Sequence, residues 1–283
     1  MAAEETTTPI DTGSSQLEAK RGIAPLWHTI VLIAAIVAIS TLGAGRMTAA
    51  GSGDPHRIVH YALSGVLELV LVAFVYLGLR LRKTPFRSLF GALPHGLNDI
   101  TREVGIAAVF WLFSMLVLAS FAFTWNAVQT AIYHRHVKSQ SSGQSAKEPS
   151  PQQEQVEMAK KLMTLAPANG IEIAAWGVLC LLVGFAEELV FRGYLQLQSI
   201  SLLHSTVFGV ALSAVVFGAA HGYQGIRGMC LISVYGALFG GIALLRRNLF
   251  PGMLAHSWHD FATGLALALI RQMHLLDHLP NLH

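Results

Sequence analysis

The chain has 283 residues, of which 53% are apolar and 12% are charged, whereas a typical soluble domain carries about 25% charged residues. This composition and a mean hydropathy of +0.51 indicate an integral membrane protein and argue against a disordered chain. The formal net charge of +3 is too small for a nucleic-acid-binding module, so no nucleic-acid partner is expected. Cys180 and Cys230 lie within apolar runs and suggest neither a disulfide framework nor a cysteine-based zinc site.

Seven apolar segments are long enough to cross a bilayer as helices, which takes about 20 residues each. The first exceeds the ~7 to 15 apolar residues of a cleaved signal peptide, so we expect it to remain as a spanning helix. The sequence therefore predicts an all-α fold, a polytopic membrane bundle of seven or eight transmembrane helices. The segments cover residues 23–44, 58–79, 103–125, 171–190, 203–220, 229–245 and 249–270.

Polar stretches divide the chain into regions. Residues 1–22 and 273–283 are expected to be tails, the first of them flexible because it is rich in Thr, Ser and Glu. The stretch 134–165 is dense in Ser, Gln, Lys and Pro and is expected to be a flexible loop. This loop separates the N-terminal transmembrane helices, residues 23–133, from a second transmembrane region, residues 166–272.

Basic residues in short loops predict the orientation, because such loops remain in the cytoplasm. Lys20 and Arg21 precede the first segment, and Arg246 and Arg247 lie between the last two. Five further basic residues lie near the connection between the second and third segments, namely Arg80, Arg82, Lys83, Arg87 and Arg102. Alternating spans put these places on one side, so we expect a cytoplasmic N-terminus, an external 134–161 loop, and residence in the plasma (inner) membrane.

Ionisable residues inside spans cost roughly 2.5 to 3.5 kcal/mol each and therefore need a reason. In the first half, Glu68 is interpreted as a neutralised or bundle-facing residue rather than a catalyst. In the second half, Glu187 and Glu188 are adjacent, and Arg192 follows Glu188 by four residues on the same helical face. One carboxylate can thus be paired while the other stays free, although a helix end at the membrane interface would also tolerate these charges.

Two more polar pairs follow on separate segments. Phe217 and His221 are one helical turn apart, and His256 and Asp260 are related in the same way. A single such histidine is usually structural, but three polar groups in neighbouring apolar segments indicate a functional site. A histidine and a carboxylate at this spacing suit either metal ligation or an imidazole oriented by a carboxylate.

In this order and on separate helices, the motifs resemble those of the CPBP family, the CAAX prenyl proteases and bacteriocin-processing enzymes also called the Abi family. The resemblance covers roughly residues 170–262, within the second transmembrane region. The motifs are Glu-Glu-x-x-x-Arg at Glu187, Glu188 and Arg192, Phe-x-x-x-His at Phe217 and His221, and His-x-x-x-Asp/Asn at His256 and Asp260.

The resemblance implies a helical bundle around a hydrophilic cavity in which a glutamate and a histidine activate water for peptide hydrolysis. Glu187 would be the general base, and His221 would help to bind the same water. Glu188 and Arg192 would form a supporting ion pair. His256 and Asp260 would stabilise the oxyanion, as fixed donors do in other acyl-transfer sites.

Asp260 raises a question, because the eukaryotic CAAX proteases are expected to have Asn at this position and an ionised carboxylate cannot donate a hydrogen bond. It must be protonated, orient His256, or bind a metal. In the last case Glu187, His221, His256 and Asp260 form a candidate ligand set for a divalent metal such as zinc. The chain lacks His-Glu-x-x-His, so the cofactor stays open.

The depth of the motif residues in the membrane is a second difficulty. If each predicted segment is a straight helix, Glu187 falls near the cytoplasmic end of one span and His221 near the outer end of the next. The fourth span must therefore extend past Val190 toward Gln198, or the fifth must begin deeper, or a helix must be broken near a glycine.

The leading hypothesis is an intramembrane endopeptidase that acts on membrane-associated or hydrophobic protein and peptide substrates, either CAAX-like or leader peptides. One alternative is an ion-coupled transporter, in which Glu, His and Asp would form a relay. The other is a non-catalytic immunity or scaffold protein that keeps the fold.

Overall fold

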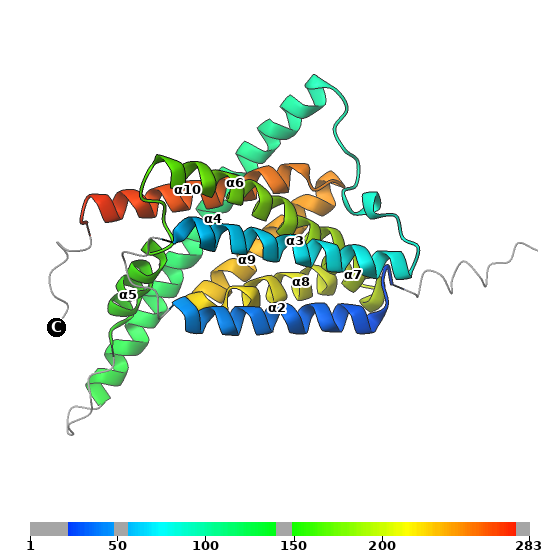
Figure 1. The fold of residues 1–283 in the computed structure, drawn as a ribbon. Helices are drawn as coiled ribbons and strands as arrows, with labels where there is room; N and C mark the ends of the chain where they lie inside the picture. Colours follow the sequence, from blue (N-terminus) through cyan, green and yellow to red (C-terminus); the bar gives the residue numbers. More distant parts are fainter. Residues whose placement is uncertain (1–21, 48–55, 140–148, 276–283) are drawn as a thin grey trace, which may run out of the picture.

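A computed structural model describes residues 22–47, 56–139 and 149–275, and the two predicted tails fall largely outside these ranges. Within the described residues the secondary structure is helical, apart from one isolated bridge between Gly91 and Asn248. The helices form an elongated bundle, with α6 and α10 side by side on one face (Figure 1). The predicted all-α membrane bundle is confirmed.

Each of the seven predicted apolar segments forms a helix. Short 3-10 turns occur at Phe86–Leu89 (η1) and Gly222–Gln224 (η3). The α-helices and one π-helical segment, η2, are α2 (Leu26–Met47), α3 (Arg57–Leu81), α4 (Leu97–Ser139), α5 (Pro151–Met163), α6 (Gly170–Glu187), η2 (Glu188–Gln196), α7 (Leu197–Leu203), α8 (Thr206–Ala220), α9 (Gly225–Arg246) and α10 (Phe250–Gln272).

Of the described helices, four are long and apolar enough to cross a membrane, so the chain is an integral membrane protein while the expected seven spans stay a prediction. Two shorter apolar helices cover Leu26–Leu42 and Thr206–Ala220. The four are Arg57–Leu81, Leu97–His136, Gly170–Leu203 and Gly222–Arg246.

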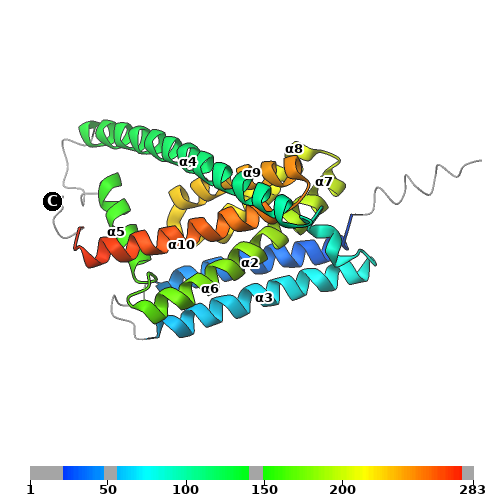
Figure 2. The same ribbon diagram turned by 90° about the horizontal axis from the view of Figure 1, so that it is seen from above.

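The prediction of a flexible loop at residues 134–165 is wrong for the part that the structure describes, which is mostly helical. Helix α4 continues to Ser139 and crosses the bundle obliquely (Figure 2). Helix α5 follows, and Ser150 and Gln153 start it with a reciprocal capping box that satisfies free backbone groups. The amide of Gln155 then donates to Asn126 Oδ1 at 3.1 Å, which ties α5 to α4. Local capping thus makes a polar stretch helical despite its composition.

The fourth predicted span is much longer than expected. Helices α6, η2 and α7 form one uninterrupted helical run from Gly170 to Leu203, which ends at His204 in a left-handed conformation (φ 51°). The next helix, α8, packs antiparallel to this run, because Gly209 lies against Ile200 and Ser213 donates to the Phe191 carbonyl at 2.8 Å. The fourth span thus extends past Val190. This is the first of the three expected ways to bring Glu187 and His221 to a similar depth.

Lys20 and Arg21 lie outside the described residues, but the start of α2 and the other two predicted basic segments meet at one end of the bundle. Thr84 donates to the Ile23 carbonyl at 2.9 Å, next to the start of α2. The amide of Ala92 donates to the Arg247 carbonyl at 3.0 Å, which joins the α3–α4 connection to the α9–α10 connection. That this end faces the cytoplasm stays a prediction.

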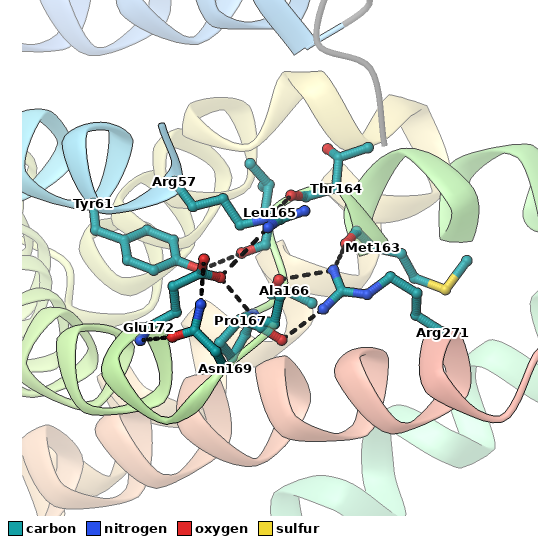
Figure 3. A network of polar contacts seen from close by, with 11 residues as sticks. Arg57, Tyr61, Met163, Thr164, Leu165, Ala166, Pro167, Asn169, Glu172 and Arg271 are labelled. Atoms are coloured by element: carbon teal, nitrogen blue, oxygen red, sulfur yellow. Dashed lines mark hydrogen bonds and ion pairs between the residues drawn. The ribbon is translucent and has the colours of Figure 1, made fainter. Parts of the chain in front are cut away.

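A polar network closes the opposite end (Figure 3). Glu172, in the first turn of α6, accepts from the Ala168 amide at 2.7 Å and from Asn169 Nδ2 at 3.0 Å. Its carboxylate also lies 3.5 Å from Arg57 at the start of α3. Arg271 of α10 donates to three backbone carbonyls, that of Met163 at the end of α5 and those of Ala166 and Pro167 in the α5–α6 connection. The connection is thereby bound to α3 and α10.

We expect Glu172→Ala to lower the stability of the bundle by about 1 to 3 kcal/mol, because buried donors lose their acceptor. Thermal unfolding of the detergent-solubilised protein measures the effect as a lower Tm. The control is Glu157→Ala, since Glu157 is solvent-exposed and pairs with exposed Lys160. Equal Tm values for the two variants would contradict the assigned role.

Candidate active site

The residues predicted from the three motifs converge around the carboxylate of Glu188. Its Oε1 atom lies 2.9 Å from Arg192 of the same helical run and 3.0 Å from Nδ1 of His256 on α10. All three side chains are buried. Since a carboxylate only accepts, His256 donates its Nδ1 hydrogen to Glu188. The predicted ion pair is present, and it also holds the imidazole.

The backbone brings these groups together in two ways. Glu188 and Arg192 lie in the π-helical segment η2, a rare geometry that is frequent at functional sites. One turn earlier, Gly184 allows α10 to approach α6 closely, because a Cβ atom there would lie 2.8 Å from the Met253 carbonyl oxygen and 2.9 Å from the Ser257 amide. Close contact at this point places His256 beside both glutamates.

The guanidinium of Arg192 is enclosed by aromatic rings. Its central carbon lies 4.2 Å from the ring centre of Phe217 on α8 and 5.2 Å from that of Phe239 on α9. It also donates to the Gly236 carbonyl at 3.3 Å. These cation–π contacts give Phe217 a physical role in the motif, since an aromatic face stabilises a cation removed from water.

Glu187 is the free carboxylate. Its Oε2 atom is buried without a hydrogen-bond partner, and it lies 3.5 Å from Nε2 of His256. Asp260 Oδ2 lies 3.7 Å from the same nitrogen, and the Asp260 side chain is 27% exposed. Nε2 of His256 thus lies between the carboxylates of Glu187 and Asp260, while Nδ1 of the same ring is hydrogen-bonded to Glu188.

His221 lies at the end of α8, where the antiparallel packing brings it back toward the level of Glu187. The chain rises about 24 Å from Glu187 to Leu203 and returns about 22 Å along α8. Nδ1 of His221 is 2.9 Å from the Phe217 carbonyl and must donate to it, which leaves Nε2 as the acceptor in the neutral ring. Asp260 is close enough to interact electrostatically with His221.

Two aromatic residues of α9 line the site and were missed by the sequence analysis. Phe239 lies 5.5 Å from the His256 ring, and Tyr235, with a buried hydroxyl, lies 4.8 Å from the His259 ring. In the sequence, the two aromatic residues are one helical turn apart, and each is followed by a glycine, Gly236 or Gly240. This pattern could have indicated that they face the site. Aromatic residues are common in apolar helices, so this signal was weak.

Binding of a metal by the candidate ligands Glu187, His221, His256 and Asp260 stays a prediction. Within the described part of the chain, no group of three or more His, Cys, Asp or Glu side chains is placed to hold a metal ion. His256 uses Nδ1 to bind Glu188, which leaves Nε2 between the carboxylates of Glu187 and Asp260. A ring nitrogen in these surroundings is able either to bind a metal or to donate a hydrogen bond.

Residues 169–262 match the family described as Type II CAAX prenyl endopeptidase Rce1-like. This segment contains all the motif residues from Glu187 to Asp260, so the resemblance predicted from those motifs is confirmed. No curated protein and no solved structure matches the chain significantly.

Replacing Arg192 by Met keeps much of the side-chain volume but leaves the buried Glu188 without its cation. We expect Arg192→Met to destabilise the protein by about 3 to 5 kcal/mol, as in other buried pairs that lose one partner. Thermal unfolding in detergent is the measurement, with Arg87→Met as the control at an exposed arginine. A Tm equal to that of the wild type would show that Glu188 does not need the cation.

Proposed function

We propose that the protein is an intramembrane endopeptidase that hydrolyses a peptide bond in a membrane-associated or hydrophobic substrate. The observation that carries the proposal is the pair of adjacent glutamates with different surroundings. Glu188 binds both Arg192 and His256 through its Oε1 atom, whereas Glu187 Oε2 is buried without a hydrogen-bond partner and lies 3.5 Å from Nε2 of His256. A carboxylate held in place yet free to accept a proton is what a general base requires.

In the proposed reaction, Glu187 takes a proton from a water molecule whose other hydrogen is accepted by Nε2 of His221. The water oxygen bonds to the substrate carbonyl carbon, and the carbonyl electron pair moves to the oxygen. When this intermediate collapses, the C–N bond breaks and the leaving amine takes the proton from Glu187. Positioned acid–base groups of this kind accelerate reactions by about 100- to 10,000-fold.

His256 is proposed to act as an imidazolium, which donates from both ring nitrogens: Nδ1 donates to Glu188 and fixes the ring, and Nε2 donates to the oxyanion. Asp260 is proposed to orient and charge-stabilise this imidazole rather than to donate, since its Oδ2 atom lies 3.7 Å from Nε2. This assignment removes the difficulty that an ionised carboxylate cannot donate to an oxyanion.

The substrate class rests on the family and on the bilayer. Residues 169–262 match CAAX prenyl endopeptidases, which favours CAAX-like peptides, and hydrophobic leader peptides are the second class to test. Both glutamates lie within the helical run Gly170–Leu203, which is long and apolar enough to cross a membrane, so substrates are proposed to reach the site from within the bilayer.

The test is cleavage of a panel of prenylated CAAX peptides and hydrophobic leader peptides by the purified protein. We expect Glu187→Gln, which keeps the side-chain shape, to reduce kcat by about 100- to 10,000-fold while the Tm stays near that of the wild type. Glu157→Gln, outside the site, serves as the control. Wild-type rates in Glu187→Gln would refute the mechanism.

Each reaction is repeated with a metal chelator. Cleavage is expected to persist, because the proposed steps need only side chains. Loss of cleavage that is restored by Zn²⁺ would instead favour the metal-bound alternative. If no peptide is cleaved by the wild type, the transporter and the non-catalytic scaffold become the leading hypotheses.

A further inference from the structure

The N-terminal half of the bundle contributes a carboxylate to the same site. Helix α3 packs along α6, and three contacts fix how the two helices are aligned. Arg57 lies beside Glu172, the Tyr61 ring lies 5.3 Å from the Trp176 ring, and Gly65 faces Leu179 and Leu182. The residue numbers rise together along both helices, so α3 and α6 run parallel.

This alignment places Glu68 beside the active site. Arg57, Tyr61, Gly65 and Glu68 recur at intervals of four, four and three residues, which puts them on one face of α3. Continuing the alignment puts Glu68 level with residues 182–185, within about one helical turn of Glu187. The bundle-facing position expected for Glu68 from the sequence is confirmed, but its surroundings are those of a site.

Two further observations agree. Glu68 is close enough to Glu187, His256 and Asp260 to interact electrostatically with each of them. Its Oε2 atom is buried and has no hydrogen-bond partner in the protein. A buried polar atom without a partner is costly, and in native proteins it usually accounts for a bound water, ion or ligand.

A peptide substrate offers hydrogen-bond donors that Oε2 of Glu68 can accept from. A peptide bound in an extended conformation inside the bundle loses the water that hydrated its backbone N–H groups, and each needs an acceptor. The other carboxylates have assigned tasks, since Glu188 holds Arg192 and His256, and Asp260 flanks Nε2 of His256. We propose that Glu68 accepts a hydrogen bond from a backbone N–H of the substrate next to the bond that is cleaved.

Glu68 is therefore a substrate-binding residue of the proposed protease, and this role rests on the proposed function. Loss of this hydrogen bond changes binding by about 10- to 100-fold, because the substrate N–H is then left buried without an acceptor. Because the bond forms in both the bound and the reacting substrate, its loss raises KM and leaves kcat nearly unchanged.

The kinetic test uses a peptide that the wild type cleaves. Glu68→Ala is expected to raise KM by about 10- to 100-fold with little change in kcat, and Glu68→Gln, which retains an acceptor oxygen, is expected to raise it less. A matched variant is Leu69→Ala, because Leu69 is the next residue and is 53% exposed on the outer face. A fall in kcat at unchanged KM, or wild-type kinetics, would overturn the proposal.

Ester analogues locate the donor. Replacing single backbone N–H groups beside the cleaved bond by oxygen removes one donor at a time. One of these peptides is expected to lose about 10-fold or more in kcat/KM with the wild type and to lose little further with Glu68→Ala. Equal losses with both proteins for every peptide would show that Glu68 is not the acceptor.

A labelling experiment does not depend on cleavage. In a chain with Cys180→Ala and Cys230→Ala, Glu68→Cys should react with a cationic, water-soluble thiosulfonate reagent, and added CAAX or leader peptide should slow the reaction. Leu69→Cys, on the outer face, should react slowly with or without peptide. If the wild type cleaves nothing, the proposed protease function fails, and protection of Glu68→Cys still decides whether Glu68 meets a bound peptide. An unreactive or unprotected thiol would overturn the inference.

Discussion

Burying the Glu188 carboxylate inside a membrane bundle requires partners on both sides of it, and the rest of the site follows from that requirement. Arg192 supplies the charge from the same helical run, and His256 supplies a hydrogen bond from α10. The aromatic rings of Phe217 and Phe239 then enclose the guanidinium. One ion pair thereby joins four helical segments, and Glu187, the preceding residue in the chain, is held with its Oε2 atom 3.5 Å from Nε2 of His256.

The fold positions this centre by packing rather than by loops. The uninterrupted run from Gly170 to Leu203 carries both glutamates near its middle, and α8 returns His221 to their level. The close approach of α10 at Gly184 sets the separation of His256 from the glutamates. Helices are stiff, so catalytic groups placed on them keep their geometry better than groups on connecting segments.

Charge is distributed unevenly between the two ends and the middle of the molecule. The basic segments gather at one end, and the network of Arg57, Glu172 and Arg271 closes the other. Between them, Glu68, Glu187, Glu188 and Asp260 form an acidic interior with Arg192 as its fixed cation. An interior of this kind is costly in a bilayer and is retained only where function uses it.

The sequence alone determined the helical class, the seven apolar segments and the residues of the three motifs, because helix-length apolar runs and charges within them are local features. Tertiary structure decided where those segments end and which residues meet. The spacing between Glu188 and Arg192 is visible along the chain, but the contact between Glu188 and His256 spans 68 positions. Capping at Ser150 turned a polar stretch into α5. Glu68 lacks a neighbouring polar motif, and only the packing of α3 on α6 brings it to the site, because contacts between distant helices depend on shape complementarity that no local pattern encodes.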